Sequence, residues 1–135
     1  MPLLPRFLCA LAACGAEFGC QQARPGYQGT DRTLVATYKS RELTADLPAN
    51  VRVPSVAAAA ELALRHRGYA VTISSKTEDF ARIEGEAPQS GAFERVIVRA
   101  RQTPGNTRVQ IVAEPLGDQT LSRSLLDEML SGLGM

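Results

Sequence analysis

The sequence has few of the residues on which recognisable active sites depend. It contains no Trp, one His, and three Cys that all fall within the first twenty residues. A zinc site needs about four ligands from His, Cys and carboxylates, so the cysteine-free remainder cannot form a Cys/His zinc site. The position of the cysteines also excludes a disulfide framework for a folded domain. Aromatic residues make up 5% of the chain, which supplies few platforms on which bases or sugars could stack.

The sequence also lacks an excess of charge of one sign. Its 15 basic and 14 acidic side chains give a formal net charge of +1. Nucleic-acid-binding domains concentrate a basic surplus, so we do not expect a nucleic-acid partner. A hydrophobic content of 44% and a charged content of 21% are ordinary for a globular protein. The length of 135 residues suits one domain better than two.

Residues 1–20 have the pattern of a targeting segment. A short apolar stretch ends in Leu11-Ala12-Ala13-Cys14, which resembles the lipobox of bacterial lipoproteins, where small residues precede a cysteine that becomes acylated. This interpretation predicts cleavage before Cys14 and anchoring in a lipid membrane through the acylated cysteine. Cys20 is the alternative acceptor, although Glu17-Phe18-Gly19 before it fits the pattern poorly. A plain signal peptide is the other alternative.

A transmembrane helix is not expected in the leader. The apolar run from Leu3 to Gly15 is interrupted by Pro5 and Arg6, and a spanning helix needs roughly 20 apolar residues. Residues 21–32 contain several breakers and no hydrophobic period, which indicates a tether. We expect a single folded domain over residues 33–135.

Hydrophobic patterning predicts the first half of the domain. The β-prone segment 34–47 predicts a first strand, bent around Lys39–Glu42. Asn50 is expected to cap the helix that follows. That helix should run to about Arg67, where Gly68 supplies a C-terminal stop.

Three or four strands are predicted next, because apolar and polar residues alternate over residues 71–74, 81–84, 96–101 and 109–114. Turn signals over Thr77–Asp79 and Thr103–Asn106 indicate antiparallel pairing. Asp118 is expected to cap a final helix with an apolar stripe. The predicted fold is α+β with the order β-α-β-β-β-β-α, in which an antiparallel sheet carries both helices on one face.

Three motifs resemble those of a known family. They are Arg41–Leu47 before an Ala-rich helix, Arg67–Val71 entering a strand, and Leu116-Gly117-Asp118 followed by Leu121–Asp127. Together they are similar to a family of small bacterial lipoproteins catalogued as domain of unknown function three-five-six-eight. The resemblance covers roughly residues 38–130. It implies the architecture and an envelope location, and it implies no activity, cofactor or catalytic residue.

No residue set in the sequence predicts catalysis or cofactor binding. His66 lies between two arginines at a helix end, where a favourable interaction with the helix C-terminus explains it better than a Ser-His-Asp arrangement. The carboxylate pairs Glu84/Glu86 and Asp127/Glu128 are interpreted as solvated surface groups. No phosphate loop or dinucleotide fingerprint is present. We therefore predict that the chain is not an enzyme and has no catalytic, cofactor or metal site.

One group of residues is a candidate docking surface. If the strands pair as predicted, four arginines lie on the outward face of the sheet around Ile97 and Val112. They are Arg82, Arg99, Arg101 and Arg108. Such a patch suits an anionic surface, either phospholipid headgroups or a partner protein. The alternative is an ordinary solvated sheet face with glutamates interleaved.

The sequence thus favours a non-enzymatic, lipid-anchored envelope lipoprotein, held in the periplasm or at the cell surface, whose domain binds an unidentified envelope protein or a surface. One alternative is a structural accessory subunit of an envelope complex. Another is a periplasmic small-ligand-binding domain, which would need a cavity between the helices and the sheet.

Overall fold

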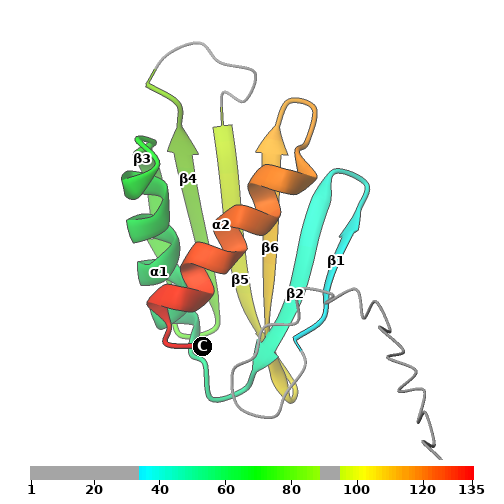
Figure 1. Cartoon of the computed structure of the whole chain (residues 1–135). Coiled ribbons are helices and arrows are strands. Elements are labelled where there is room, and N and C mark those ends of the chain that lie inside the picture. The colour runs from blue at the N-terminus through cyan, green and yellow to red at the C-terminus, as the bar shows by residue number, and fades with distance from the viewer. Residues whose placement is uncertain (1–33, 89–94) are drawn as a thin grey trace, which may run out of the picture.

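The computed structural model describes residues 34–88 and 95–135. These residues form six strands and two helices, and the strands are ordered β1-β2-β6-β5-β4-β3 across one sheet (Figure 1). The elements are β1 Ala36–Lys39, β2 Glu42–Pro48, α1 Val53–His66, β3 Ala70–Lys76, β4 Phe80–Glu86, β5 Arg95–Thr103, β6 Asn106–Glu114 and α2 Gln119–Gly132. The leader expected over residues 1–20 and the tether over residues 21–32 lie outside the described residues.

The predicted α+β arrangement is confirmed. Every pair of neighbouring strands is antiparallel, and both helices lie on the same side of the sheet (Figure 1). The turn predicted over Thr103–Asn106 is present, because those two residues pair and Gly105 has a φ of 87°. A type II turn requires such a positive φ at its third residue.

The first predicted strand reverses where we expected it only to bend. β1 and β2 form a hairpin in which Lys39 pairs with Glu42. The two residues between them, Ser40 and Arg41, have φ values of 53° and 69°. Two successive residues of positive φ match the tight hairpin turn whose twist suits flanking strands. Such turns usually contain Asn or Gly, so this one carries no signal in the sequence.

A single hydrophobic core fills the space between the helices and the sheet. The inner face of the sheet contributes alternate residues from its central strands, all buried: Leu43, Ala45, Leu47, Ala81, Ile83, Val96, Val98, Ala100, Val109, Ile111 and Ala113. The helices contribute their apolar stripes, including Val56, Leu64, Leu125 and Met129. The period-two burial along each strand is the alternation that the sequence predicted.

Helix α1 packs very close to the sheet at Gly85 in β4. A Cβ atom at this position would lie 3.1 Å from the Cβ of Tyr69 and 3.3 Å from both Cδ atoms of Leu64. The buried Ala57 and Ala60 on α1 have side chains small enough to allow this approach. The Ala-rich character of the helix therefore serves packing and leaves no interior space.

The helix ends confirm two cap predictions and correct one. Asn50 does not cap α1, because the N-cap residue is Arg52 and its side chain makes no capping hydrogen bond. At the other end Gly68, with a φ of 81°, terminates the helix as predicted. The carboxylate of Asp118 accepts a hydrogen bond of 2.9 Å from the Leu121 backbone N–H, as predicted for α2.

Candidate docking surface

The face of the sheet opposite the helices, here called the outer face, carries the four arginines singled out from the sequence. The strand register places Arg82 of β4 directly opposite Arg99 of β5. In the next cross-strand row, Arg101 of β5 lies directly opposite Arg108 of β6. We call Arg82, Arg99, Arg101 and Arg108 the arginine quartet.

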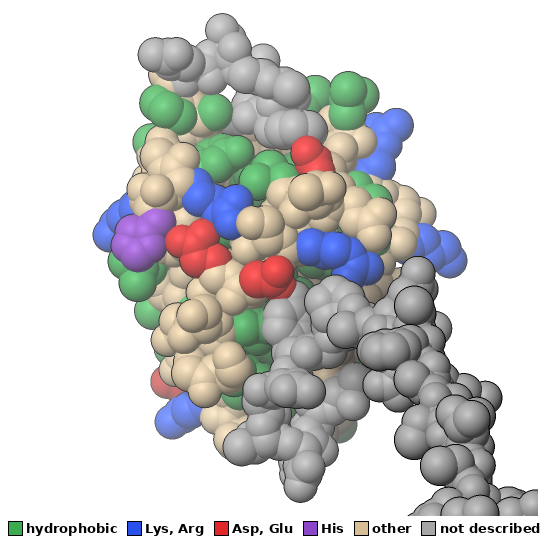
Figure 2. All heavy atoms as spheres, in the orientation of Figure 1, with side chains coloured by type: hydrophobic (Ala, Val, Ile, Leu, Met, Phe, Trp, Pro, Cys, Tyr) green, Lys and Arg blue, Asp and Glu red, His purple; other side chains and the backbone are tan. Residues whose placement is uncertain are grey.

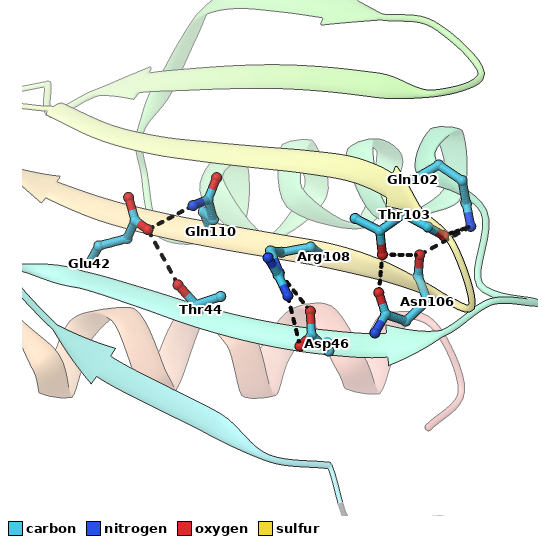
Figure 3. A network of polar contacts seen from close by, with 8 residues as sticks. All are labelled: Glu42, Thr44, Asp46, Gln102, Thr103, Asn106, Arg108 and Gln110. Atoms are coloured by element: carbon cyan, nitrogen blue, oxygen red, sulfur yellow. Dashed lines mark hydrogen bonds and ion pairs between the residues drawn. The ribbon is translucent and has the colours of Figure 1, made fainter.

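Two members of the quartet have carboxylate partners on the same face. The Nε atom of Arg108 donates to Asp46 Oδ1 at 2.9 Å, and its Nη2 atom donates to Oδ2 at 3.4 Å (Figure 3). This hydrogen bond to Asp46 raises the pKa of Arg108 above its ordinary value. Arg82 donates from its Nε atom to Glu84 Oε1 at 2.6 Å. Both contacts neutralise their arginine locally.

The other two members have no such neutralisation among the described residues. The guanidinium carbon of Arg101 lies 5.7 Å from the centroid of the Phe80 ring, a cation–π arrangement that leaves its charge in place. No described carboxylate lies within ion-pair distance of Arg99. Uncompensated positive charge on this face is therefore concentrated on β5.

Directly opposed like charges make the quartet unfavourable for stability. The sheet contains two such pairs, Arg82 with Arg99 and Arg101 with Arg108. Like charges directly opposite on neighbouring strands are destabilising, by an amount comparable to the 0.2–1 kcal/mol or so of a favourable pair. The quartet thus has the character of a surface arranged for an anionic contact rather than for folding.

Glu84 corrects the interpretation of the β4 glutamates as solvated groups. Its side chain is 4% exposed although it lies on the outer face. In the register it stands between Ile73 of β3 and Ile97 of β5. Arg95 Nη1 approaches its second carboxylate oxygen at 3.9 Å. Glu84 is therefore the buried anion of a small ion cluster, whereas its neighbour Glu86 is exposed.

The two apolar residues of the predicted surface differ in accessibility. Ile97 and Val112 lie directly opposite each other. Ile97 is only 3% exposed, whereas Val112 is half-buried. Ile97 consequently supports the outer face from beneath, and Val112 with the arginines offers the contact area.

A polar network continues the outer face toward the β1 edge. Glu42 Oε1 accepts hydrogen bonds from Gln110 Nε2 at 2.8 Å and from Thr44 Oγ1 at 3.3 Å (Figure 3). Gln110 lies directly opposite Arg99 in the register. The carboxylate of Glu42 is therefore held by Gln110 and Thr44 and is not a counterion for Arg99.

The single histidine belongs to an ionic contact between the two helices. His66 Nδ1 lies 3.2 Å from Glu128 Oε1, and Arg67 Nε donates to Glu128 Oε2 at 2.8 Å. Arg67 also donates to Ser124 Oγ at 2.6 Å. Figure 2 shows the histidine beside an acidic group on the helix face. Glu128 thus joins α2 to the end of α1, which corrects its interpretation as a solvated surface group.

The largest hollow lies at one end of the sheet and not between the helices and the sheet. It has a volume of about 950 Å³ and is lined by the β2–α1 loop, the β5–β6 turn and the end of α2, including Val51, Arg52, Asn106 and Met135. The space between helices and sheet, which a ligand-binding domain would need, is filled by the core. Among the described residues no three His, Cys, Asp or Glu side chains gather as a metal site would require.

Neither of the described helices has the length and apolar character needed to cross a membrane. The predicted acylation sites, Cys14 and Cys20, lie outside the described residues. No protein-family model matches the chain, and no curated protein matches it. Membership of the lipoprotein family named above therefore stays a prediction.

Proposed function

We propose that this chain is a lipid-anchored, non-enzymatic protein-binding module of the cell envelope that binds its partner through the outer face of its sheet. The observation that carries the proposal is the one-sided architecture. Both helices cover the same face, and the opposite face carries Arg99 and Arg101 without a described counterion. A face with unopposed charge above a buried apolar residue such as Ile97 combines the features of a protein interface.

The anchoring half of the proposal rests on the Leu11–Cys14 motif and is tested by acyl labelling with membrane fractionation. We expect fatty-acid label and membrane association to disappear in Cys14→Ser and to persist in Cys20→Ser. Loss of label only in Cys20→Ser would move the anchor to the second cysteine. Label absent from the unaltered chain would refute lipid anchoring.

The binding half is tested by photo-crosslinking in intact cells. A photoreactive amino acid replaces Val112 or Gln110 on the outer face, or the exposed Leu62 of α1 as the matched control. We expect a discrete adduct from the two outer-face positions and none from Leu62. Equal adducts from both faces, or none from the outer face, would contradict the proposal. A stoichiometric complex held mainly through the helix face would favour the accessory-subunit alternative.

A further inference from the structure

Two arginines on β5 have the spacing of a receptor for paired carboxylates. Arg99 and Arg101 are two residues apart on one face of a strand, which separates their side-chain origins by about 7 Å. Residues on the adjoining strands hold the carboxylates of the face away from them, because Asp46 is engaged by Arg108 and Glu84 by Arg82. Neither guanidinium therefore has a described carboxylate to which its N–H groups can donate.

An acidic protein segment matches this spacing. Acidic residues at alternate positions of an extended segment stand about 7 Å apart, and residues four apart on a helix stand about 6 Å apart. Each carboxylate could then accept two parallel hydrogen bonds from one guanidinium. Such a partner would also relieve the two directly opposed arginine pairs, Arg82 with Arg99 and Arg101 with Arg108.

The charge distribution favours a protein segment over a bilayer. Five carboxylates share the outer face with the quartet, namely those of Glu42, Asp46, Glu84, Glu86 and Glu114. A uniformly anionic membrane laid on the face would meet these carboxylates as well as the arginines, so much of the attraction would cancel. A protein segment with acidic residues only at its centre meets the arginines alone.

We propose that Arg99 and Arg101 form a binding site for an acidic protein segment whose carboxylates lie about 6–7 Å apart. The proposal rests on the proposed function, because it specifies the chemistry of the partner that the outer face binds. The flanking Arg82 and Arg108 add positive potential while remaining paired with their own carboxylates.

The test uses the full chain with Cys14→Ser and Cys20→Ser, so that no acyl chain contributes to binding. The probe is a synthetic peptide of alternating Glu and Thr, and its matched control alternates Gln and Thr. A second arm measures sedimentation with phosphatidylglycerol vesicles. The test variant is Arg99→Gln/Arg101→Gln. The control variant Arg65→Gln/Arg123→Gln removes the same charge from the helices.

We expect the Glu peptide to bind the unaltered outer face and the Gln peptide not to bind. The Arg99→Gln/Arg101→Gln variant should weaken Glu-peptide binding roughly tenfold, as expected for the loss of two partly exposed charge-assisted contacts. The helix-face variant should retain binding, and vesicle sedimentation should be the same in all variants.

Three outcomes would overturn the inference: no binding of the Glu peptide, equal weakening by both double variants, or vesicle sedimentation that depends on Arg99 and Arg101 while the peptide is ignored. The last would assign the site to lipid headgroups. Failure of the proposed function is recognised separately, because photo-crosslinking at Val112 and Gln110 does not depend on the peptide. Outer-face adducts that survive Arg99→Gln/Arg101→Gln would preserve the docking face and reject its acidic partner.

Discussion

Replacing the buried carboxylate of Glu84 tests the ion cluster of the outer face most directly. Glu84→Gln retains the size of the side chain and an oxygen acceptor, but it removes the charge that faces Arg82 and Arg95. The change therefore isolates the electrostatic contribution of Glu84 from its packing between Ile73 and Ile97.

The expected magnitude follows from the unequal burial of the partners. Breaking a fully buried ion pair by removing one member costs about 3–5 kcal/mol, whereas an exposed pair contributes about 0.2–1 kcal/mol. The Glu84 side chain is 4% exposed, but those of Arg82 and Arg95 are 38% and 44% exposed. Because both arginines can rehydrate after the change, we expect Glu84→Gln to lower the free energy of unfolding by about 1–2 kcal/mol.

Urea unfolding gives the required measurement, provided that the dependence on denaturant concentration is unchanged between variants. Glu86→Gln is the matched control, since Glu86 is exposed two residues further along the same strand, and it should change stability by less than about 0.5 kcal/mol. The Glu84 effect should also persist in about 1 M salt, which screens exposed charges strongly. A loss below about 0.5 kcal/mol for Glu84→Gln would refute the account of a buried anion.

Three further changes probe the fold. Gly68→Ala should destabilise by about 1–2 kcal/mol in thermal or urea unfolding, because a φ of 81° disfavours any Cβ while the surrounding space is open; Gly68→Asn should be milder, and equal effects would contradict this reason. Asp118→Ala should cost about 1 kcal/mol by removing the cap on the Leu121 N–H, and an unchanged midpoint would show that the cap is dispensable. A hydrogen bond from Ser74 and a neighbouring lysine lower the pKa of Glu61, so this group stabilises the fold at pH values above its unfolded pKa. That contribution is lost as the pH falls through the lowered folded pKa, and stability measured from about pH 6 to about pH 3 should depend less on pH in Glu61→Gln.

The regular features of the fold were predictable because each has a local cause. Alternation over residues 96–101 and 109–114 identified the two longest strands, since every second residue had to meet the core. Gly68 and Asp118 act within one turn of their own helices, so their sequence neighbours sufficed. The turn at Ser40 escaped prediction because neither of its residues is a habitual former of positive φ.

The candidate site was predictable in position but not in its electrostatics. Strand alternation alone brings the quartet to one face, because Arg99 and Arg101 share a strand parity and short turns set the register. Which arginine is neutralised depends on pairing between distant segments, as in Asp46 with Arg108, sixty-two residues apart. The burial of Glu84 likewise follows from its cross-strand neighbours, which the alternation of its own strand does not reveal.

The quartet finally sets stability against binding, and the conflict itself can be measured. Arg99 faces Arg82 across one strand pair, so replacing it with a residue that suits a strand removes a repulsion without opening the core. Arg99→Thr should therefore raise the free energy of unfolding by about 0.5 kcal/mol in urea while weakening Glu-peptide binding. Arg108→Thr is the informative contrast, since it removes the opposed charge but also the pairing with Asp46, and its gain should be smaller. If Arg99→Thr is destabilising instead, the outer face already compensates its arginines, and the physical reason for assigning them to a partner disappears.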